Sequence, residues 1–157
     1  MERFGHMFKA KDGKKYKVSI VNNGYYESPP HHYIHVEVRG YDIADGYFFP
    51  NHLIFYLDEL GTNVFNLQNK GIGREAIKTI CDYILKYCDD FVFLAQPNLH
   101  NGSVGFYKKC GFEDLNSTKV FKKTAIAFMN SIVKPWDDDA RKMMFLLVKK
   151  KGLNKRV

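Results

Sequence analysis

A turn with two glycines stands between an apolar run and an amphipathic segment, and its residue types suit chemistry on an anion. It reads Gln68-Asn69-Lys70-Gly71-Ile72-Gly73-Arg74. Two glycines one residue apart let the backbone turn tightly and present consecutive N–H groups. The helix predicted to follow adds its own unpaired N–H groups and the positive end of its dipole. The segment therefore predicts an anion cradle suited to phosphate, with Lys70 and Arg74 adding positive charge.

Two common phosphate-binding motifs do not fit this turn well. A Walker A loop requires Gly-x-x-x-x-Gly-Lys-Ser/Thr, a string that the chain lacks. A dinucleotide fingerprint requires Gly-x-Gly-x-x-Gly, and Ala76 stands at its third position, which weakens the match without excluding it. The acidic residue expected after the next strand is also missing, since Gln96-Pro97-Asn98 stands there.

A third scheme fits better when a motif downstream is added to it. Gln68-x-x-Gly71-x-Gly73 resembles the Gln/Arg-x-x-Gly-x-Gly/Ala pyrophosphate loop of the GNAT superfamily of N-acetyltransferases, which bind acetyl-CoA. After its next strand that family shows Tyr-x-x-x-Gly-Phe, and this chain has Tyr107-x-x-x-Gly111-Phe112. The resemblance covers residues 53–112 well and residues 144–148 more loosely. Two motifs in this order, with a helix and a buried strand between them, argue against a chance match.

The resemblance implies a fold and a co-substrate. The fold would be mixed α/β, with a mostly antiparallel sheet that contains a splayed parallel strand pair and is flanked by helices. Residues 1–157 would form one acyltransferase domain, with a cofactor-binding core at 52–112 and the last strands, an inserted helix and a basic tail at 113–157. Acetyl-CoA would be the co-substrate, with its pyrophosphate on the seven residues of the glycine turn and its pantetheine arm near Asn98 and Tyr107.

The same resemblance implies direct attack of a primary amine on the thioester. A Tyr hydroxyl in the place of Tyr107 protonates the leaving thiolate in that family, and the amine loses its proton to a carboxylate. We expect Glu59 to be this base, with Asp58 as the alternate, because both stand near the end of the strand before the turn. Successive residues of a strand face opposite sides, so only one of the two can face the cleft. Glu37, His35 or water stay open as alternatives.

The acceptor amine is not identified by the sequence. A protein N-terminus, a lysine, a polyamine, an aminoglycoside or a small metabolite all fit, because the N-terminal helix pair that shapes the acceptor site in the family is not evident in residues 1–52. A CoA-binding domain without catalysis, or a small basic-tailed module that binds nucleic acid or protein, are the alternatives. The oligomeric state, a homodimer included, is left open.

The histidines and cysteines do not predict a metal site. In His31-His32-x-x-His35 no carboxylate or cysteine stands at a ligand spacing from the histidines. Cys81 and Cys88 lie on the apolar face of a predicted helix and fit core positions. We therefore expect no metal.

Hydrophobic periodicity predicts the elements that position these residues. Strands are expected at 16–20, 33–39, 53–60, 91–95 and 144–148, and helices at 74–88 and 103–110. Asn22-Asn23-Gly24 and Pro29-Pro30 are expected to break structure, and a further helix is expected near 121–132.

Composition sets the remaining bounds. The chain has 157 residues, of which 45% are hydrophobic, and no apolar run reaches the ~20 residues of a membrane helix. Three cysteines and the lack of a signal peptide favour a reducing, cytoplasmic location. The net charge of +7 lies in residues 141–157, which hold seven basic and no acidic residues. The rest of the chain is neutral, so nucleic acid is not the expected partner.

Overall fold

The computed structural model describes residues 2–27, 30–61, 70–97, 103–114 and 143–150. The chain divides into two compact units, Met1–Val92 with Leu147–Val157, and Phe93–Leu146. Neither helix of the described part has the length and apolarity needed to cross a membrane. The predictions for Gln68, Asn69 and Asn98, for the helix near 121–132 and for the tail after residue 150 lie outside the described residues.

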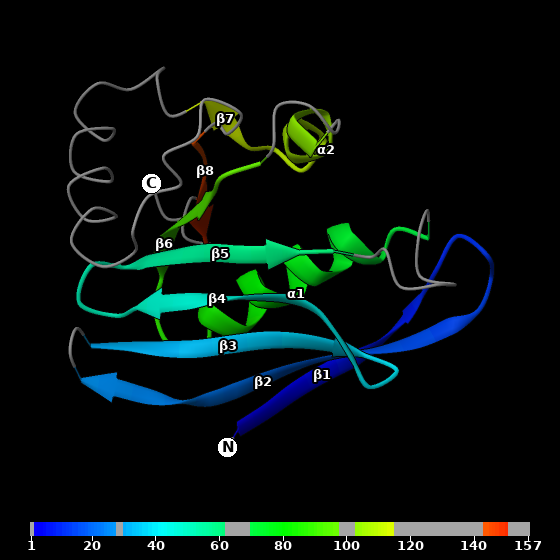
Figure 1. The fold of residues 1–157 in the computed structure, drawn as a ribbon, viewed down its shortest axis with the longest axis horizontal. Helices are drawn as coiled ribbons and strands as arrows, with labels where there is room; N and C mark the ends of the chain where they lie inside the picture. Colours follow the sequence, from blue (N-terminus) through cyan, green and yellow to red (C-terminus); the bar gives the residue numbers. More distant parts are fainter. Residues whose placement is uncertain (1, 28–29, 62–69, 98–102, 115–142, 151–157) are drawn as a thin grey trace. The chain divides into compact units, whose positions relative to one another are not determined.

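Five strands of the first unit form an antiparallel meander (Figure 1). Apolar residues alternate along the middle strands, so that Val18, Ile20, Ile34 and Val36 are buried on one face. The registers pair Ile20 with Val36 and Val36 with Ala44, which carries this buried face across the sheet. The strands are β1 (Glu2–Lys9), β2 (Lys15–Glu27), β3 (Pro30–Val38), β4 (Tyr41–Phe49) and β5 (Ile54–Leu60).

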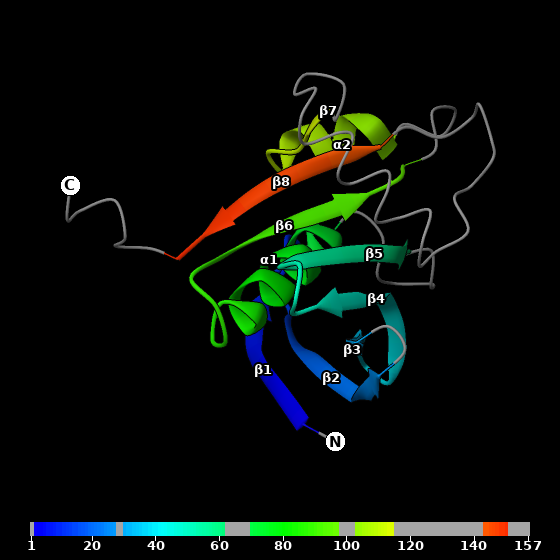
Figure 2. The ribbon, with the colours of Figure 1, turned by 90° about the vertical axis from the view of Figure 1, so that its left-hand side faces the viewer.

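Helix α1 (Ile72–Ile84) covers that buried face of the meander (Figures 1 and 2). Its apolar residues recur every three or four positions, and Ile72, Ala76, Ile80 and Ile84 are buried. Burying each isoleucine side chain stabilises the packing by roughly 1.5–3 kcal/mol. The helix does not cover the opposite face of the meander, where the alternate strand positions place polar side chains.

Three further strands complete the sheet, in the order β1-β2-β3-β4-β5-β6-β8-β7. They are β6 (Asp90–Ala95), β7 (Glu113–Asp114) and β8 (Met144–Lys149). Near the start of β6 the Val92 N–H donates to the Leu53 carbonyl at 2.9 Å. The predicted mixed, mostly antiparallel sheet with one parallel pair is confirmed. The splay of that pair and the domain boundaries stay predictions.

The second unit, Phe93–Leu146, contains helix α2 (Ser103–Lys109) and the short antiparallel pair of β7 with β8. Its core holds Phe93 and Phe112, whose rings meet edge to face with centroids 5.3 Å apart. Tyr107 and Met144 are buried in the same unit.

Some expected boundaries were wrong. Asn22-Asn23-Gly24 does not end a strand, because β2 continues to Glu27 through a bulge at which Gly24 takes a φ of 136°. Helix α1 runs from Ile72 to Ile84, shifted toward the N-terminus from the expected 74–88. Strands β1 and β4 were not predicted. In β1, Gly5 interrupts the alternation, and an added Cβ there would lie 2.7 Å from the Val18 carbonyl oxygen.

Candidate functional site

The glycine turn passes directly into α1. Gly71 is the N-cap residue, with φ 81° in the left-handed region that favours glycine, and its carbonyl accepts the Glu75 N–H at 3.1 Å. A glycine cap supplies no side chain to the N–H groups of Ile72, Gly73 and Arg74. These three N–H groups, at the positive end of the helix dipole, can therefore bind an anion such as a phosphate.

The hairpin between β1 and β2 braces this turn. The Lys70 carbonyl accepts the Lys11 N–H at 3.2 Å, while the Lys70 ammonium donates to the Tyr16 hydroxyl at 2.9 Å and pairs with Asp12 at 3.1 Å. These contacts, with the Tyr16 hydrogen bond first, raise the pKa of Lys70. The Lys14 backbone N–H, with further help from Tyr16 and Lys70, lowers the pKa of Asp12 to about 2.

Lys70 therefore differs from Arg74, the other predicted basic residue of the cradle. Its charge is largely compensated by Asp12, whereas the Arg74 side chain is exposed at the first turn of α1. The geometry gives Lys70 the role of holding the turn in place and leaves Arg74 as the basic side chain available to a bound anion.

Asp45 and Glu59 pair across the face of the meander that α1 does not cover, and Asp58 is near enough for its charge to act on Asp45. We call Asp45, Asp58 and Glu59 the carboxylate cluster. Asp45 of β4 pairs directly across from Glu59 of β5, and the register shifts between Asp45 and Gly46, which brings Asp58 close as well. On the neighbouring strand β3, His35 pairs with Asp45. His35 and the buried Val36 are successive residues that face opposite sides of the sheet, so Asp45 lies on the face away from α1. Both predicted base candidates on β5 therefore lie beside a carboxylate that the sequence did not single out.

The surroundings of Asp45 perturb its carboxyl group. Burial, followed by the negative charges of Asp58 and Glu59, raises the pKa of Asp45 to about 6. One carboxylate oxygen, Oδ1, is buried without a hydrogen-bond partner among the residues that the structure describes. A carboxylate with a pKa near neutrality can accept a proton from an attacking amine more readily than an ordinary Asp.

Two tyrosines flank Asp45 on the same face. The Tyr33 hydroxyl hydrogen-bonds Asp45, and burial together with the Asp45 charge raises the pKa of Tyr33 to about 12. Burial, followed by the charge of Asp58, also raises the pKa of Tyr47. The rings of Tyr33 and Tyr47 stack with centroids 5.4 Å apart. An aromatic wall beside carboxylates is the environment in which an ammonium group is stabilised.

Asp45 could have been found from the sequence by counting back across a hairpin. Pro50-Asn51 separates two apolar runs, which is typical of a turn between antiparallel strands. Phe49 pairs with Ile54, so pairing outward from the turn brings Asp45 opposite the end of β5. The register shift beside Gly46 moves that partner to Glu59, a detail that no sequence pattern shows.

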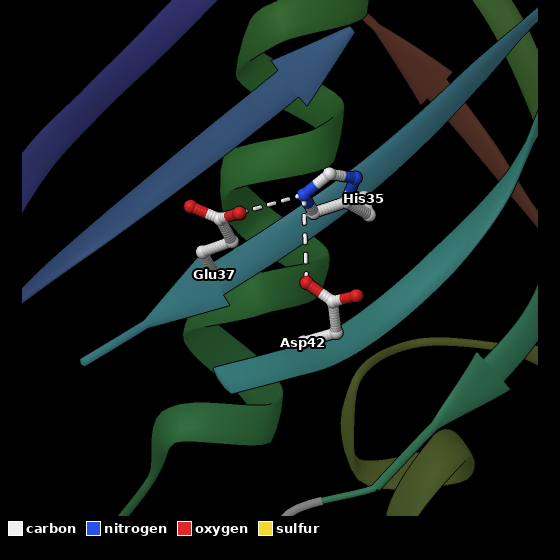
Figure 3. Close-up of side chains that lie close together, drawn as sticks. All are labelled: His35, Glu37 and Asp42. Atoms are coloured by element: carbon white, nitrogen blue, oxygen red, sulfur yellow. Dashed lines mark hydrogen bonds and ion pairs between the residues drawn. The ribbon is translucent and has the colours of Figure 1, made fainter. Parts of the chain in front are cut away.

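A second polar group on the same face contains His35, Glu37 and Asp42, and we call it the His35 cluster (Figure 3). His35 Nε2 lies 2.9 Å from Glu37 Oε1 and 3.4 Å from Asp42 Oδ1. The hydrogen bond with His35, together with the nearby Arg3, lowers the pKa of Glu37. The expectation that no carboxylate is spaced with these histidines was wrong, because Glu37 stands two positions along the same strand face.

The three histidines do not act together. His32 points to the opposite face, where its Nδ1 lies 3.2 Å from Asn22 Nδ2, and His31 stacks on Tyr26 with ring centroids 5.1 Å apart. The strand alternation separates His32 from His31 and His35, which is why the run of histidines does not form one site.

The motif Tyr107-x-x-x-Gly111-Phe112 is a helix C-cap. The Phe112 N–H donates to the Tyr107 carbonyl at 3.0 Å and the Gly111 N–H to the Lys108 carbonyl at 3.0 Å, which is the Schellman pattern. Gly111 has φ 97°, and the Tyr107 and Phe112 rings pack with centroids 5.1 Å apart. The spacing is thus explained by helix termination, whatever the hydroxyl of Tyr107 does.

One known protein family matches part of this chain. Residues 66–112 match the model of the "Acetyltransferase (GNAT) family", so the resemblance seen in the sequence is confirmed over this segment. Comparison with curated proteins gives no match.

Two solved structures are similar to the chain. The spermidine/spermine N-acetyltransferase SpeG from Vibrio cholerae, in complex with manganese ions, has a TM-score of 0.48 at 17% identity, covering 81% of this chain and 70% of its own. A Bacillus anthracis (strain Ames) protein assigned provisionally as a streptothricin acetyltransferase, in complex with acetyl coenzyme A, has a TM-score of 0.43 at 13% identity, covering 94% and 83%.

Proposed function

Because residues 66–112 match the GNAT acetyltransferase family model, we propose that this protein is an N-acetyltransferase that transfers an acetyl group from acetyl-CoA to a primary amine. The observation that carries the proposal is the left-handed glycine cap at Gly71, which lies inside the family match and opens the N-terminus of α1 to an anion. The pyrophosphate of acetyl-CoA would bind the N–H groups of Ile72, Gly73 and Arg74, with Gln68 and Asn69 completing the loop.

The chemical step needs one base and one acid. The neutral amine nitrogen attacks the thioester carbonyl carbon, the C–N bond forms, and the C–S bond breaks as the tetrahedral intermediate collapses. The nitrogen loses a proton to the base, and the sulfur leaves as a thiolate that takes a proton from the acid. We assign the acid role to Tyr107 on the strength of the motif Tyr107-x-x-x-Gly111-Phe112, which resembles that of the family. Asn98 is proposed to lie near the pantetheine arm, although the family's usual asparagine would fall at His100.

We assign the base role to the carboxylate cluster. Glu59 was expected from the sequence, and Asp45 is the stronger candidate because burial and the neighbouring carboxylates raise its pKa to about 6, close to neutral pH. Two carboxylates on neighbouring strands can also share the proton as it leaves. Tyr33 and Tyr47 support an acceptor that arrives as an ammonium ion, because its charge is stabilised by both the carboxylates and the rings.

A thiol-release assay tests the proposal. Purified protein is mixed with acetyl-CoA and a panel of amines, and liberated CoA is measured with a thiol reagent. We expect amine-dependent release, lowered about 10²-fold or more in Asp45→Asn, while Asp82→Asn, an exposed carboxylate on α1, keeps the parent rate.

Calorimetry with CoA separates the alternatives. Binding of CoA without thiol release for any amine would support a CoA-binding domain that does not catalyse. The absence of CoA binding would contradict the proposal and favour a small protein- or nucleic-acid-binding module. The cytoplasmic location stays a prediction, and the oligomeric state, a homodimer included, stays open.

A further inference from the structure

We propose that His35, Glu37 and Asp42, the His35 cluster, form a binding site for one divalent transition-metal cation. The three side chains project from β3 and β4 toward a common point on the face that α1 leaves uncovered (Figure 3). Each offers one ligand atom, and the three atoms all lie within 4.8 Å of one another. The site adjoins the carboxylate cluster, because His35 pairs with Asp45, but the proposal of a metal site does not depend on the acetyl-transfer proposal.

The distances in this cluster match those between ligands of one metal ion. With metal–ligand bonds of about 2.1 Å, two ligands at a right angle lie about 3.0 Å apart and two at the tetrahedral angle about 3.4 Å. His35 Nε2 lies 2.9 Å from Glu37 Oε1 and 3.4 Å from Asp42 Oδ1. A cation can therefore enter between these atoms with small side-chain movements.

The surroundings of the cluster orient its ligands. The Asn23 amide contacts Nδ1 of His35, so the imidazole is held from behind while Nε2 points to the carboxylates. When a cation takes Nε2, the proton of the ring stays on Nδ1, and the Asn23 amide can turn to accept it with its oxygen. Arg3 holds the other oxygen of Glu37, Oε2, at 3.2 Å. Contacts of this kind, made by groups behind the ligands, are what fixes ligand orientation at metal centres.

The charge of the cluster favours a cation. Glu37 and Asp42 bring two negative charges, and Arg3 compensates one of them from a side chain that is 60% exposed. Asp45 stands directly across the ladder from His35 and adds negative charge nearby. One imidazole and two carboxylates suit Mn²⁺, Fe²⁺, Co²⁺ or Zn²⁺ rather than Ca²⁺, which takes six to eight oxygen ligands. Three protein ligands leave coordination positions for water.

Cobalt provides the direct test. The full-length protein is freed of metal with EDTA, dialysed and titrated with CoCl₂ while its visible absorption is recorded. We expect one equivalent to bind with a spectrum of nitrogen and oxygen ligation and no thiolate charge-transfer band. His35→Gln and Glu37→Gln should each weaken binding about 10-fold or more. Asp42 is the exposed ligand, so Asp42→Asn serves as a third variant if His35 and Glu37, which are half-buried, do not tolerate substitution.

The control is another histidine–carboxylate pair of the same chain. His6 Nε2 lies 2.5 Å from Glu75 Oε1 but has no third ligand among the described residues, so His6→Gln should leave the cobalt affinity unchanged. Failure to bind one equivalent of cobalt saturably would overturn the proposal. Undiminished affinity in folded His35→Gln and Asp42→Asn proteins, or a spectrum dominated by thiolate bands, would also overturn it.

Discussion

Replacing Asp45 with asparagine should make the protein more stable at neutral pH and equally stable in mild acid. The amide keeps the size of the side chain and can still accept the Tyr33 hydroxyl. It removes a charge that burial and the neighbouring Asp58 and Glu59 disfavour. The substitution therefore isolates the energetic cost of ionising one carboxylate inside the carboxylate cluster.

The magnitude follows from the pKa. Asp45 rises from 3.8 to about 6 in the folded protein, and each pKa unit corresponds to about 1.4 kcal/mol, which gives an upper limit of about 3 kcal/mol. The side chain is only partly buried, so solvent screening reduces the expected effect to about 1–2 kcal/mol. Because the folded pKa is raised, the contribution of Asp45 to stability is complete below about pH 4 and is lost as the pH rises through about 6.

Urea denaturation of both proteins at several pH values, in EDTA, measures this effect. We expect Asp45→Asn to exceed the parent by about 1–2 kcal/mol at pH 7.5 and to match it near pH 4. Protonation of Glu37 and Asp12, whose pKa values are lowered, destabilises both proteins equally at lower pH. The difference in unfolding free energy between the two proteins therefore isolates the effect of Asp45. A difference that does not change between these two pH values would refute the reasoning.

Two further predictions rest on the backbone positions of glycines, and a third rests on the proposed acid role of Tyr107. Gly111→Ala should destabilise the protein by about 1 kcal/mol or more in urea because of its φ of 97°, whereas Gly105→Ala, inside α2 with open space for a Cβ, should stabilise it by about 0.5–1 kcal/mol. Gly46→Ala should lower stability by about 2–3 kcal/mol, since the added Cβ would lie 2.3 Å from the Tyr56 carbonyl oxygen; a thermal shift of less than a few degrees would contradict this. Tyr107→Phe should retain CoA affinity and slow thiol release about 10²-fold, and parent-like turnover would remove the acid role.

The parts of the fold that could be predicted are those in which one face of an element is buried and the other is not. Helix α1 was visible because Ala76, Ile80 and Ile84 recur at helical spacing, and β6 because Phe91–Ala95 is apolar throughout. β4 was missed because burial on both faces near its end, at Phe48 and Phe49, hides the alternation. β1 was missed because the close approach of its backbone to Val18 requires Gly5, which reads as a break.

The sequence predicted the local motifs of the candidate site but not the contacts between residues on different strands. The glycine turn and Tyr107-x-x-x-Gly111-Phe112 are local motifs, so spacing revealed them. Asp45 meets Glu59, and His35 meets Asp42, through strand pairing and register shifts that depend on the whole sheet. Lys70 shows the same limit, because its pairing with Asp12 at the tip of a distant hairpin could not be read from its neighbours.

The brace between Lys70 and the N-terminal hairpin has a consequence for the order of folding. The Lys70 ammonium bonds the Tyr16 hydroxyl across 54 residues of chain, so the hairpin is synthesised well before the turn that it holds. Because closing a long loop costs chain entropy before its contacts form, we expect the anion cradle to be completed after the hairpin has formed. Removal of the first strand, which contains none of the residues of the glycine turn, should therefore impair maturation of the turn itself.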